Sequence, residues 1–256
     1  MPPRISLVIP AWNEARRLPA SLAHLTAFVA ARGAAMGGVE VVLVVEPCED
    51  ETLALAQAHA REHAWLSVIG TPVHRGKGAA VRTGMLAAGG ALLIYMDADL
   101  SVPLQEVEAF VARFDAEPGL AVLVGNRAHA RSRIGRRQSF FRRSLGRMFN
   151  VLLKAAGIAS LGDTQCGFKA FRRDAAHAVF GLQELDGFAF DVEVLLLAGG
   201  LGLRVEDHPV EWINSPESKL SIVRDSVGML MDTVRVRALV RRTLSRHRCE
   251  RGGAGA

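Results

Sequence analysis

The sequence is most informative between residues 91 and 103, where it runs Ala91-Leu92-Leu93-Ile94-Tyr95-Met96-Asp97-Ala98-Asp99-Leu100-Ser101-Val102-Pro103. The first six residues are apolar and predict a buried strand. Two carboxylates follow one residue apart, and in an extended chain side chains at positions i and i+2 point to the same face. Asp97 and Asp99 could therefore bind one hard divalent cation, which in turn could hold a nucleotide diphosphate. The alternative is a turn in which both carboxylates cap the helix that follows Pro103.

Around this stretch the chain alternates β-rich runs with helical patterns. The expected strands are Ile5 to Ile9, Val39 to Val45, Leu66 to Ile69, Ala91 to Met96, Leu120 to Val124 and a later one around Val205 to Trp212; the expected helices are about Glu14 to Arg32, Asp50 to His63, Gly78 to Ala88, Leu104 to Ala116 and Val192 to Ala198. Strand and helix alternation with short connections predicts an α/β fold, with a mostly parallel, Rossmann-like sheet covered by helices on both faces.

Polar loops follow the first five expected strands. They are Pro10-Ala11-Trp12-Asn13-Glu14, Glu46-Pro47-Cys48-Glu49-Asp50, His74-Arg75-Gly76-Lys77-Gly78, Asp97-Ala98-Asp99 and Gly125-Asn126-Arg127. Ligands of such sheets bind at the carboxyl ends of the strands, so these loops should share one rim. Trp12 lies on this rim but is expected to pack rather than to bind. Five polar loops in one place favour the metal interpretation of Asp97 and Asp99.

Composition limits the classes of protein that the chain can form. It has 256 residues, half of them hydrophobic, and three cysteines without paired or metal-ligand spacing. These features predict one large α/β domain in a reducing compartment. We expect this domain to span residues 1–220, a basic helical extension to span 221–247 and a disordered tail to span 248–256. No run approaches the ~18 apolar residues of a membrane span, so we expect a cytoplasmic protein.

Arginines are clustered although the net charge is only +5. They are Arg131, Arg133, Arg136, Arg137, Arg142, Arg143 and Arg147 in one segment, and Arg235, Arg237, Arg241, Arg242, Arg246, Arg248 and Arg251 near the other end. Such clusters suggest an anionic partner. Residues 131–157 also carry apolar side chains at helical spacing, which suits an amphipathic helix lying on an anionic membrane. The alternative is a helix whose apolar stripe packs on the domain while its arginines are solvated.

The motifs together resemble a known family. Val8-Ile9-Pro10-Ala11-Trp12-Asn13-Glu14, Gly76-Lys77-Gly78, Asp97-Ala98-Asp99 and Gly125-Asn126-Arg127 are similar to the inverting glycosyltransferases of family 2, which have a GT-A fold. Asp163-Thr164-Gln165-Cys166-Gly167-Phe168-Lys169, Phe190-Asp191-Val192-Glu193 and Ser218-Lys219-Leu220 more narrowly resemble the dolichyl-phosphate β-glucosyltransferases and their polyprenyl-phosphate relatives. The resemblance extends from about Ile5 to Arg237.

The resemblance implies a role for each rim loop. Asp97, Asp99 and Ser101 would hold Mg²⁺ or Mn²⁺, and the nucleotide-sugar donor would be bound by Pro10, Glu14, Glu46, Lys77, Asp97 and Arg127. Glu46 stands where the family usually has an Asp that accepts hydrogen bonds from the donor base. The alternative for Glu46 is a solvated acidic turn between strand and helix, and Lys77 and Arg127 could be ordinary surface charges.

The later motifs imply catalytic and acceptor-binding residues. Gln165 and Lys169, expected on a loop after the basic helix, would orient the sugar and the acceptor phosphate. Asp191 would bind sugar hydroxyls, or act as a base for an alcohol acceptor; its alternative role is an N-cap of the helix that follows. Lys219, Arg136 and Arg143 would bind the acceptor phosphate, although a lone lysine in a polar loop is usually solvated.

Three functional hypotheses follow. The first is a metal-dependent, inverting transfer of a hexose to a polyprenyl or dolichyl phosphate. The expected hexose is glucose from UDP-glucose. The enzyme would be held peripherally on the cytoplasmic face of a membrane. The second keeps the fold and donor but has a soluble acceptor. The third is a non-enzymatic nucleic-acid-binding protein, which no recognisable motif supports; we therefore expect no nucleic-acid partner. A homodimer is compatible with the sequence.

Overall fold

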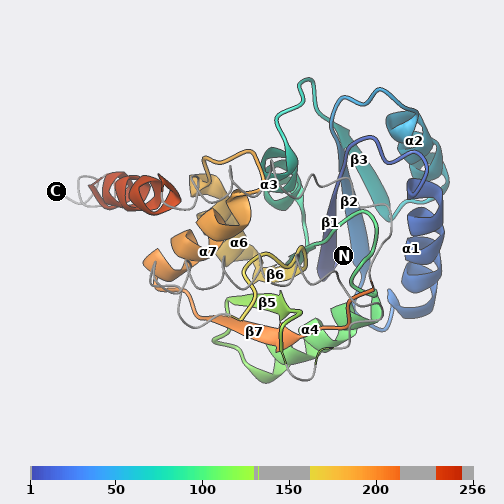
Figure 1. The fold of residues 1–256 in the computed structure, drawn as a ribbon. Coiled ribbons are helices and arrows are strands. Elements are labelled where there is room, and N and C mark those ends of the chain that lie inside the picture. Colours follow the sequence, from blue (N-terminus) through green and yellow to red (C-terminus); the bar gives the residue numbers. More distant parts are fainter. Residues whose placement is uncertain (1, 130–131, 133–161, 214–234, 250–256) are drawn as a thin grey trace.

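A computed structural model describes residues 2–129, 132, 162–213 and 235–249 of the chain (Figure 1). The expected basic helix at 131–157, apart from Ser132, lies outside the described residues, as do Lys219 and residues 250–256 of the expected tail. Among the residues that are described, no helix combines the length and the apolar content needed to cross a membrane.

A mixed sheet forms the centre of the molecule. Its strands are β1 (Ile5–Ala11), β2 (Val39–Val45), β3 (Leu66–Gly70), β4 (Leu92–Tyr95), β5 (Val122–Asn126), β6 (Lys169–Arg172) and β7 (Val205–Pro209), in the spatial order β3-β2-β1-β4-β6-β5-β7. Every pairing is parallel except those of β6, which runs antiparallel to both β4 and β5. The prediction of a mostly parallel sheet is confirmed.

Helices cover both faces of the sheet, as the sequence predicted. They are α1 (Leu18–Arg32), α2 (Thr52–Glu62), α3 (Lys77–Ala87), α4 (Gln105–Ala116), α6 (Arg173–Leu182) and α7 (Phe190–Gly200). In Figure 1, α1 and α2 lie on one side of β1 to β3, and α3 lies on the other. The helices α1, α2 and α4 pack in one apolar layer, and α3, α6 and α7 pack in the other.

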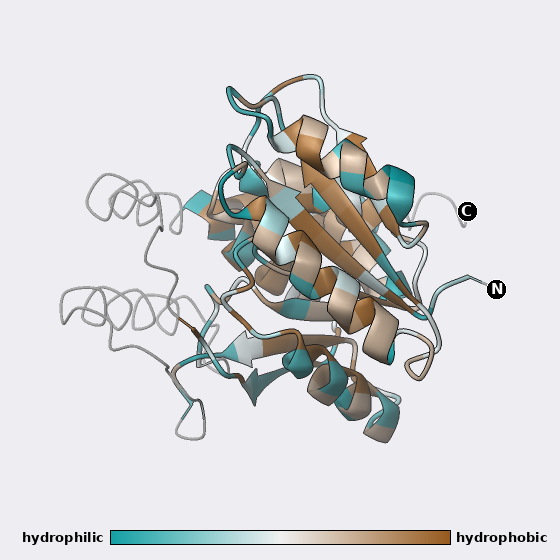
Figure 2. Cartoon of the chain, turned by 90° about the vertical axis from the view of Figure 1, so that its right-hand side faces the viewer, coloured by the Kyte–Doolittle hydropathy of each residue, from teal (hydrophilic) through white to brown (hydrophobic). Residues whose placement is uncertain are grey.

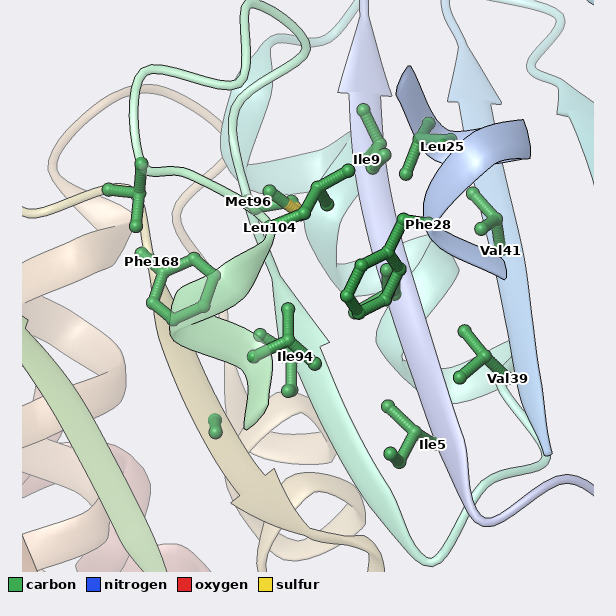
Figure 3. Packing of buried hydrophobic residues seen from close by; sticks show 14 of the residues in the cluster. Ile5, Ile9, Leu25, Phe28, Val39, Val41, Ile94, Met96, Leu104 and Phe168 are labelled. Atoms are coloured by element: carbon green, nitrogen blue, oxygen red, sulfur yellow. The ribbon is translucent and has the colours of Figure 1, made fainter. Parts of the chain in front are cut away.

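The strands divide their side chains between two apolar layers. Ile5, Leu7 and Ile9 of β1 belong to one layer with residues of α1 and α4, and Figure 3 shows Ile9 near Leu25 of α1. Val8 points to the other layer, with residues of α3 and α7. This alternation follows from the two-residue period of a strand. The strands are accordingly apolar, while the helices carry polar residues on their outer faces (Figure 2).

Two features of the fold differ from the sequence prediction. The strand β6 and the helix α6 were not predicted, so Lys169 begins a central strand instead of lying in a loop. The first helix begins at Leu18 and not near Glu14, because residues 15–17 form a turn and Pro19 occupies the start of the helix, where proline is well tolerated.

Residues 235–249 form a helix, which continues two residues past the expected boundary at 247. Val236 and Val240 are buried in the layer that contains α7, and Leu244 packs against Gly200. Thr243 donates a hydrogen bond to Glu184, which Arg246 also contacts. The apolar side of this described part of the extension is thus packed on the domain, and Arg235, Arg241, Arg242, Arg246 and Arg248 are exposed.

Candidate active site

The Asp97-Ala98-Asp99 segment lies directly after β4, at the carboxyl edge of the sheet. The hydroxyl of Ser21 in α1 donates to the Ala98 carbonyl oxygen at 2.6 Å, which fixes the segment against the first helix. Oδ1 of Asp99 accepts hydrogen bonds from the backbone N–H (3.0 Å) and the hydroxyl (2.7 Å) of Ser101. Ser101 therefore orients the Asp99 carboxylate in this structure.

Lys77 joins this segment from the neighbouring loop. It is the first residue of α3, and its Nζ lies 2.5 Å from Oδ1 of Asp97. Burial lowers the pKa of Lys77, but the charges of Asp97 and Asp191 and the hydrogen bond to Asp97 outweigh it, so the pKa is raised. An ammonium that is charged near neutral pH thus stands beside the first carboxylate. The two residues that the sequence placed on one rim are in contact.

Gly167 approaches Asp97 from the opposite side. A Cβ at Gly167 would lie 2.6 Å from Cγ and 2.7 Å from Oδ1 of Asp97, and closer still to Oδ2, so only glycine leaves room for this carboxylate. The loop that carries Gly167 is held by Asp163, whose carboxylate binds Nε (2.6 Å) and Nη2 (3.0 Å) of Arg127. Burial raises the pKa of Asp163, but the Arg127 charge outweighs it and the pKa is lowered. Arg127 is thus engaged by Asp163 and fixes the loop.

Lys169 and Asp191 form a buried ion pair beneath the rim. Nζ of Lys169 lies 2.5 Å from Oδ1 of Asp191 and 2.6 Å from the Cys166 carbonyl oxygen, and the Tyr95 hydroxyl donates to the same Asp191 oxygen at 2.6 Å. Lys169 and Tyr95 are fully buried, and Asp191 is 4% exposed. Burial, followed by the Asp191 charge, raises the pKa of Tyr95 well above its usual value. Asp191 lies inside the first turn of α7, and Ala189 is the N-cap.

Glu46, Pro10 and Glu14 take different positions on the rim. Pro10 is part of β1. The Glu14 carboxylate binds Arg17 at 2.5 and 2.7 Å, and Arg17 in turn lies 3.8 Å from Asp99. Glu46 is 4% exposed and accepts hydrogen bonds from the loop before α3. Glu14 is thus linked through Arg17 to Asp99, and Glu46 is linked to the loop that precedes Lys77.

Trp12 and His74 are rim residues that the sequence analysis did not select. Their rings stack at 4.6 Å between centroids, and Trp12 remains 43% exposed, so Trp12 packs against His74 at the surface of the rim. The Trp12 ring N–H donates to the Pro47 carbonyl oxygen at 3.1 Å. The only sequence signal was their position in the loops that follow β1 and β3, the strands on either side of β2.

The oxygen ligands at this edge suit a hard cation. Asp97 is 40% and Asp99 is 17% exposed at the side chain, and the space beside Asp97 depends on the missing Cβ of Gly167. In the described part of the chain no group of three His, Cys, Asp or Glu residues forms a complete metal cluster. Mg²⁺ and Mn²⁺ do not need one, because carboxylate, water and phosphate oxygens together complete their coordination.

Comparison with known sequences identifies the family. The model of the family "Glycosyl transferase family 2" matches residues 6–180, which span all but the last of the strands described above. The chain belongs to this family. It is a glycosyltransferase. The chain is 34% identical over 225 residues to a dolichyl-phosphate beta-glucosyltransferase of Drosophila melanogaster, covering 85% of this chain and 69% of the relative. It is 31% identical over 236 residues to one of Trichomonas vaginalis, with 90% and 70% covered.

Solved structures support the fold of this glycosyltransferase. Glucosyl-3-phosphoglycerate synthase from Mycobacterium tuberculosis in complex with UDP superposes with a TM-score of 0.67 at 18% identity, covering 95% of this chain and 80% of the other. The same enzyme with Mn²⁺, UDP and glucosyl-3-phosphoglycerate gives a TM-score of 0.65 at 17% identity, covering 91% and 78%. The GT-A fold expected from the sequence is confirmed.

The structure brings most of the predicted site residues together. Asp97, Asp99, Ser101, Lys77 and Glu46 lie on one rim, and Arg127 is connected to it through the loop of Asp163. Arg136, Arg143 and Lys219, the predicted acceptor-binding residues, lie outside the described residues. Their role stays a prediction.

Proposed function

We propose that this glycosyltransferase transfers glucose from UDP-glucose to a polyprenyl or dolichyl phosphate with inversion at the sugar C1. The observation that carries the proposal is the similarity to dolichyl-phosphate beta-glucosyltransferases over 85–90% of the chain, centred on a rim where Asp97, Asp99 and Lys77 meet. A nucleotide sugar presents a diphosphate, and this combination of carboxylates and an ammonium suits that group.

Asp97 and Asp99 would hold Mg²⁺ or Mn²⁺ at this rim. When bound, the metal ion supplies charge compensation for the diphosphate. Lys77 adds a fixed positive charge beside Asp97, and Ser101 keeps the Asp99 carboxylate oriented. Charges that are fixed before the reaction stabilise a leaving group without reorganisation.

The contacts of the Asp163 and Asp191 carboxylates favour a phosphate acceptor over an alcohol acceptor. Asp163 is bound to Arg127, and Asp191 accepts hydrogen bonds from Lys169 and Tyr95, so each is already engaged. An alcohol would need a general base, and Asp191 is poorly placed to serve because it is 4% exposed and is ion-paired with Lys169. An acceptor phosphate is anionic near neutral pH. Its oxygen can form the bond to C1 while the bond from C1 to the diphosphate oxygen breaks and its electron pair leaves with UDP, so positioning is sufficient.

Two buried polar atoms are candidates to position the substrates. Nε2 of Gln165 and Oγ1 of Thr164 are buried and have no hydrogen-bond partner among the described residues. An unpaired buried donor costs roughly 1–3 kcal/mol, so a sugar hydroxyl or phosphate oxygen that paired with it would be bound favourably. Both residues lie on the loop that brings Gly167 to Asp97. We assign Gln165 to the orientation of the sugar or acceptor phosphate.

Contact with an anionic membrane completes the proposal. The exposed arginines of residues 235–249 can attract anionic lipid electrostatically, whereas the apolar side of that helix is already packed on the domain. Membrane contact by these residues should therefore weaken as the salt concentration rises.

The test is a radiolabelled donor assay with liposomes that contain polyprenyl phosphate. UDP-glucose and GDP-mannose are compared, each with Mn²⁺, with Mg²⁺ and with EDTA. The proposal predicts chloroform-soluble label from UDP-glucose that requires metal and is lost in Asp99→Asn. Asp174→Asn in α6, an exposed carboxylate of the same kind, is the matched control and should keep activity.

Three outcomes contradict parts of the proposal. Transfer to a soluble acceptor, or donor hydrolysis without lipid product, would favour the second hypothesis. Full activity in EDTA would exclude the metal. The absence of any nucleotide-sugar turnover or binding would contradict the proposed donor.

A further inference from the structure

Glu46 binds three consecutive residues of the loop before α3. Its Oε1 accepts hydrogen bonds from the backbone N–H groups of Arg75 (2.7 Å) and Gly76 (2.8 Å), and its Oε2 lies 2.9 Å from Nδ1 of His74. Glu46 stands at the end of β2, about thirty residues before these partners, and is 4% exposed. The carboxylate therefore joins two adjacent rim loops.

These contacts leave little of the carboxylate for a ligand. An ionised carboxylate has about four acceptor sites, and the residues 74–76 occupy three of them. Trp12 in turn stacks on His74, one of these three partners. A residue that reads the edge of a nucleotide base needs an exposed acceptor. Glu46 therefore does not fit the base-reading role that the sequence suggested.

The loop that Glu46 holds determines where Lys77 emerges. Gly76 has φ +119°, a conformation that other residues rarely adopt, and a Cβ there would lie 2.9 Å from the Asp186 carbonyl oxygen. A Cβ at Gly78 would lie 2.6 Å from the Leu185 carbonyl oxygen. The backbone on both sides of Lys77 is thus packed against the loop before α7. Glu46 anchors it from the β2 side.

We propose that Glu46 is a positioning residue, which holds residues 74–76 so that the ammonium of Lys77 meets Asp97 at the diphosphate site. The contacts from Glu46 to the loop and from Lys77 to Asp97 form one continuous path across the rim. The role at a diphosphate rests on the proposed function, whereas the anchoring of the loop does not. Base selectivity then comes from other residues.

Two conservative variants separate positioning from base reading. Glu46→Gln keeps an acceptor oxygen at the same distance, so the bonds to Arg75 and Gly76 can persist. Glu46→Asp shortens the side chain by about 1.5 Å, so that the carboxylate no longer reaches both N–H groups. If Glu46 positions the loop, Glu46→Gln should lower activity mildly and Glu46→Asp should lower it severely. Base reading predicts the reverse order, because Asp is the residue that the resembled family usually carries there.

Hydrogen exchange measures the anchoring without any donor. In the full chain, exchange of the amides in residues 71–80 should be about tenfold or more faster in Glu46→Asp and close to wild type in Glu46→Gln. Glu49→Asp, an exposed change in the same loop as Glu46, is the control and should leave exchange unchanged. Unchanged exchange in Glu46→Asp would overturn the proposal, even if no donor were found.

Activity and binding then test the connection to Lys77. Glu46→Asp should lower kcat about tenfold to a hundredfold, with the ratio of UDP to GDP affinity unchanged. In a Lys77→Ala background Glu46→Asp should lower kcat by less than about threefold, because both changes remove the same function. Additive losses, or an altered preference between UDP and GDP, would overturn the proposal.

Discussion

Substituting Gly167 by alanine tests whether the geometry around Asp97 is what makes the rim active. The added Cβ would lie 2.6 Å from Cγ of Asp97, whereas ordinary contact begins at 3.4 Å. The carboxylate must therefore move by about 1 Å, and a misplacement of that size costs about a hundredfold in rate. The Asp97 side chain is 40% exposed and has room to move, so the fold itself should tolerate the change.

The expected result is a loss of activity without a loss of stability. Gly167 does not have a positive φ, so alanine can adopt its backbone conformation, and replacing glycine at such a site stabilises by about 0.4–1 kcal/mol through the unfolded state. We expect a midpoint of urea unfolding close to that of the wild type and weaker binding of Mn²⁺ and UDP by calorimetry. The rate of lipid glucosylation should fall about a hundredfold.

Gly181→Ala is the matched control. Gly181 lies in α6, and nothing lies within 4 Å of a Cβ built there. This variant should be fully active and slightly more stable, because alanine favours helix by roughly 1 kcal/mol over glycine. If Gly167→Ala keeps activity within about threefold of wild type while the control behaves as expected, the Asp97 carboxylate is not held in a critical position and the reasoning fails.

Two further predictions concern the interior beneath the rim. Lys169→Met should destabilise the protein by about 3–5 kcal/mol in urea unfolding, because it leaves the Asp191 carboxylate buried without its cation. The double variant Lys169→Met/Asp191→Asn should recover part of this loss. Equal stabilities of the single and double variants would contradict a buried ion pair. Burial raises the pKa of the Cys166 thiol to about 12. At pH 8 iodoacetamide should therefore modify the exposed Cys249 and should react with Cys166 only after unfolding, as measured by peptide mass spectrometry. Rapid labelling of Cys166 in the native protein would contradict this prediction.

The sequence predicted the parts of the fold that depend on local pattern. The apolar runs of β1 to β5 and the helices between them could be read from their periods, and the rule that ligands bind at the ends of parallel strands placed Asp97 and Lys77 on one rim. Their contact at 2.5 Å agrees with that placement. The string from Asp163 to Lys169 was selected by resemblance, and the structure places its Gly167 beside Asp97, a geometry that the sequence did not show.

The features that were missed depend on partners far away in the chain. The strand β6 has four residues and begins with Lys169, which a pattern of apolar residues does not favour for a central strand. Lys169 can be buried there only because Asp191, twenty-two residues later, neutralises it. Glu46 was predicted to read the donor base or to lie in a solvated turn, since its partners at residues 74–76 become neighbours only in the folded sheet.

The position of β6 between β4 and β5 has a consequence for the order of folding. In the described sheet β1, β2, β3 and β4 can assemble from the first 95 residues alone, but β5 pairs only with β6 and β7. Until residues 169–172 have been synthesised and inserted, the edge of β4 is unpaired and open to wrong partners. The same insertion brings Gly167 to Asp97. Pairing of the β4 edge and completion of the rim are therefore the same late event, and β7 pairs with β5 after it.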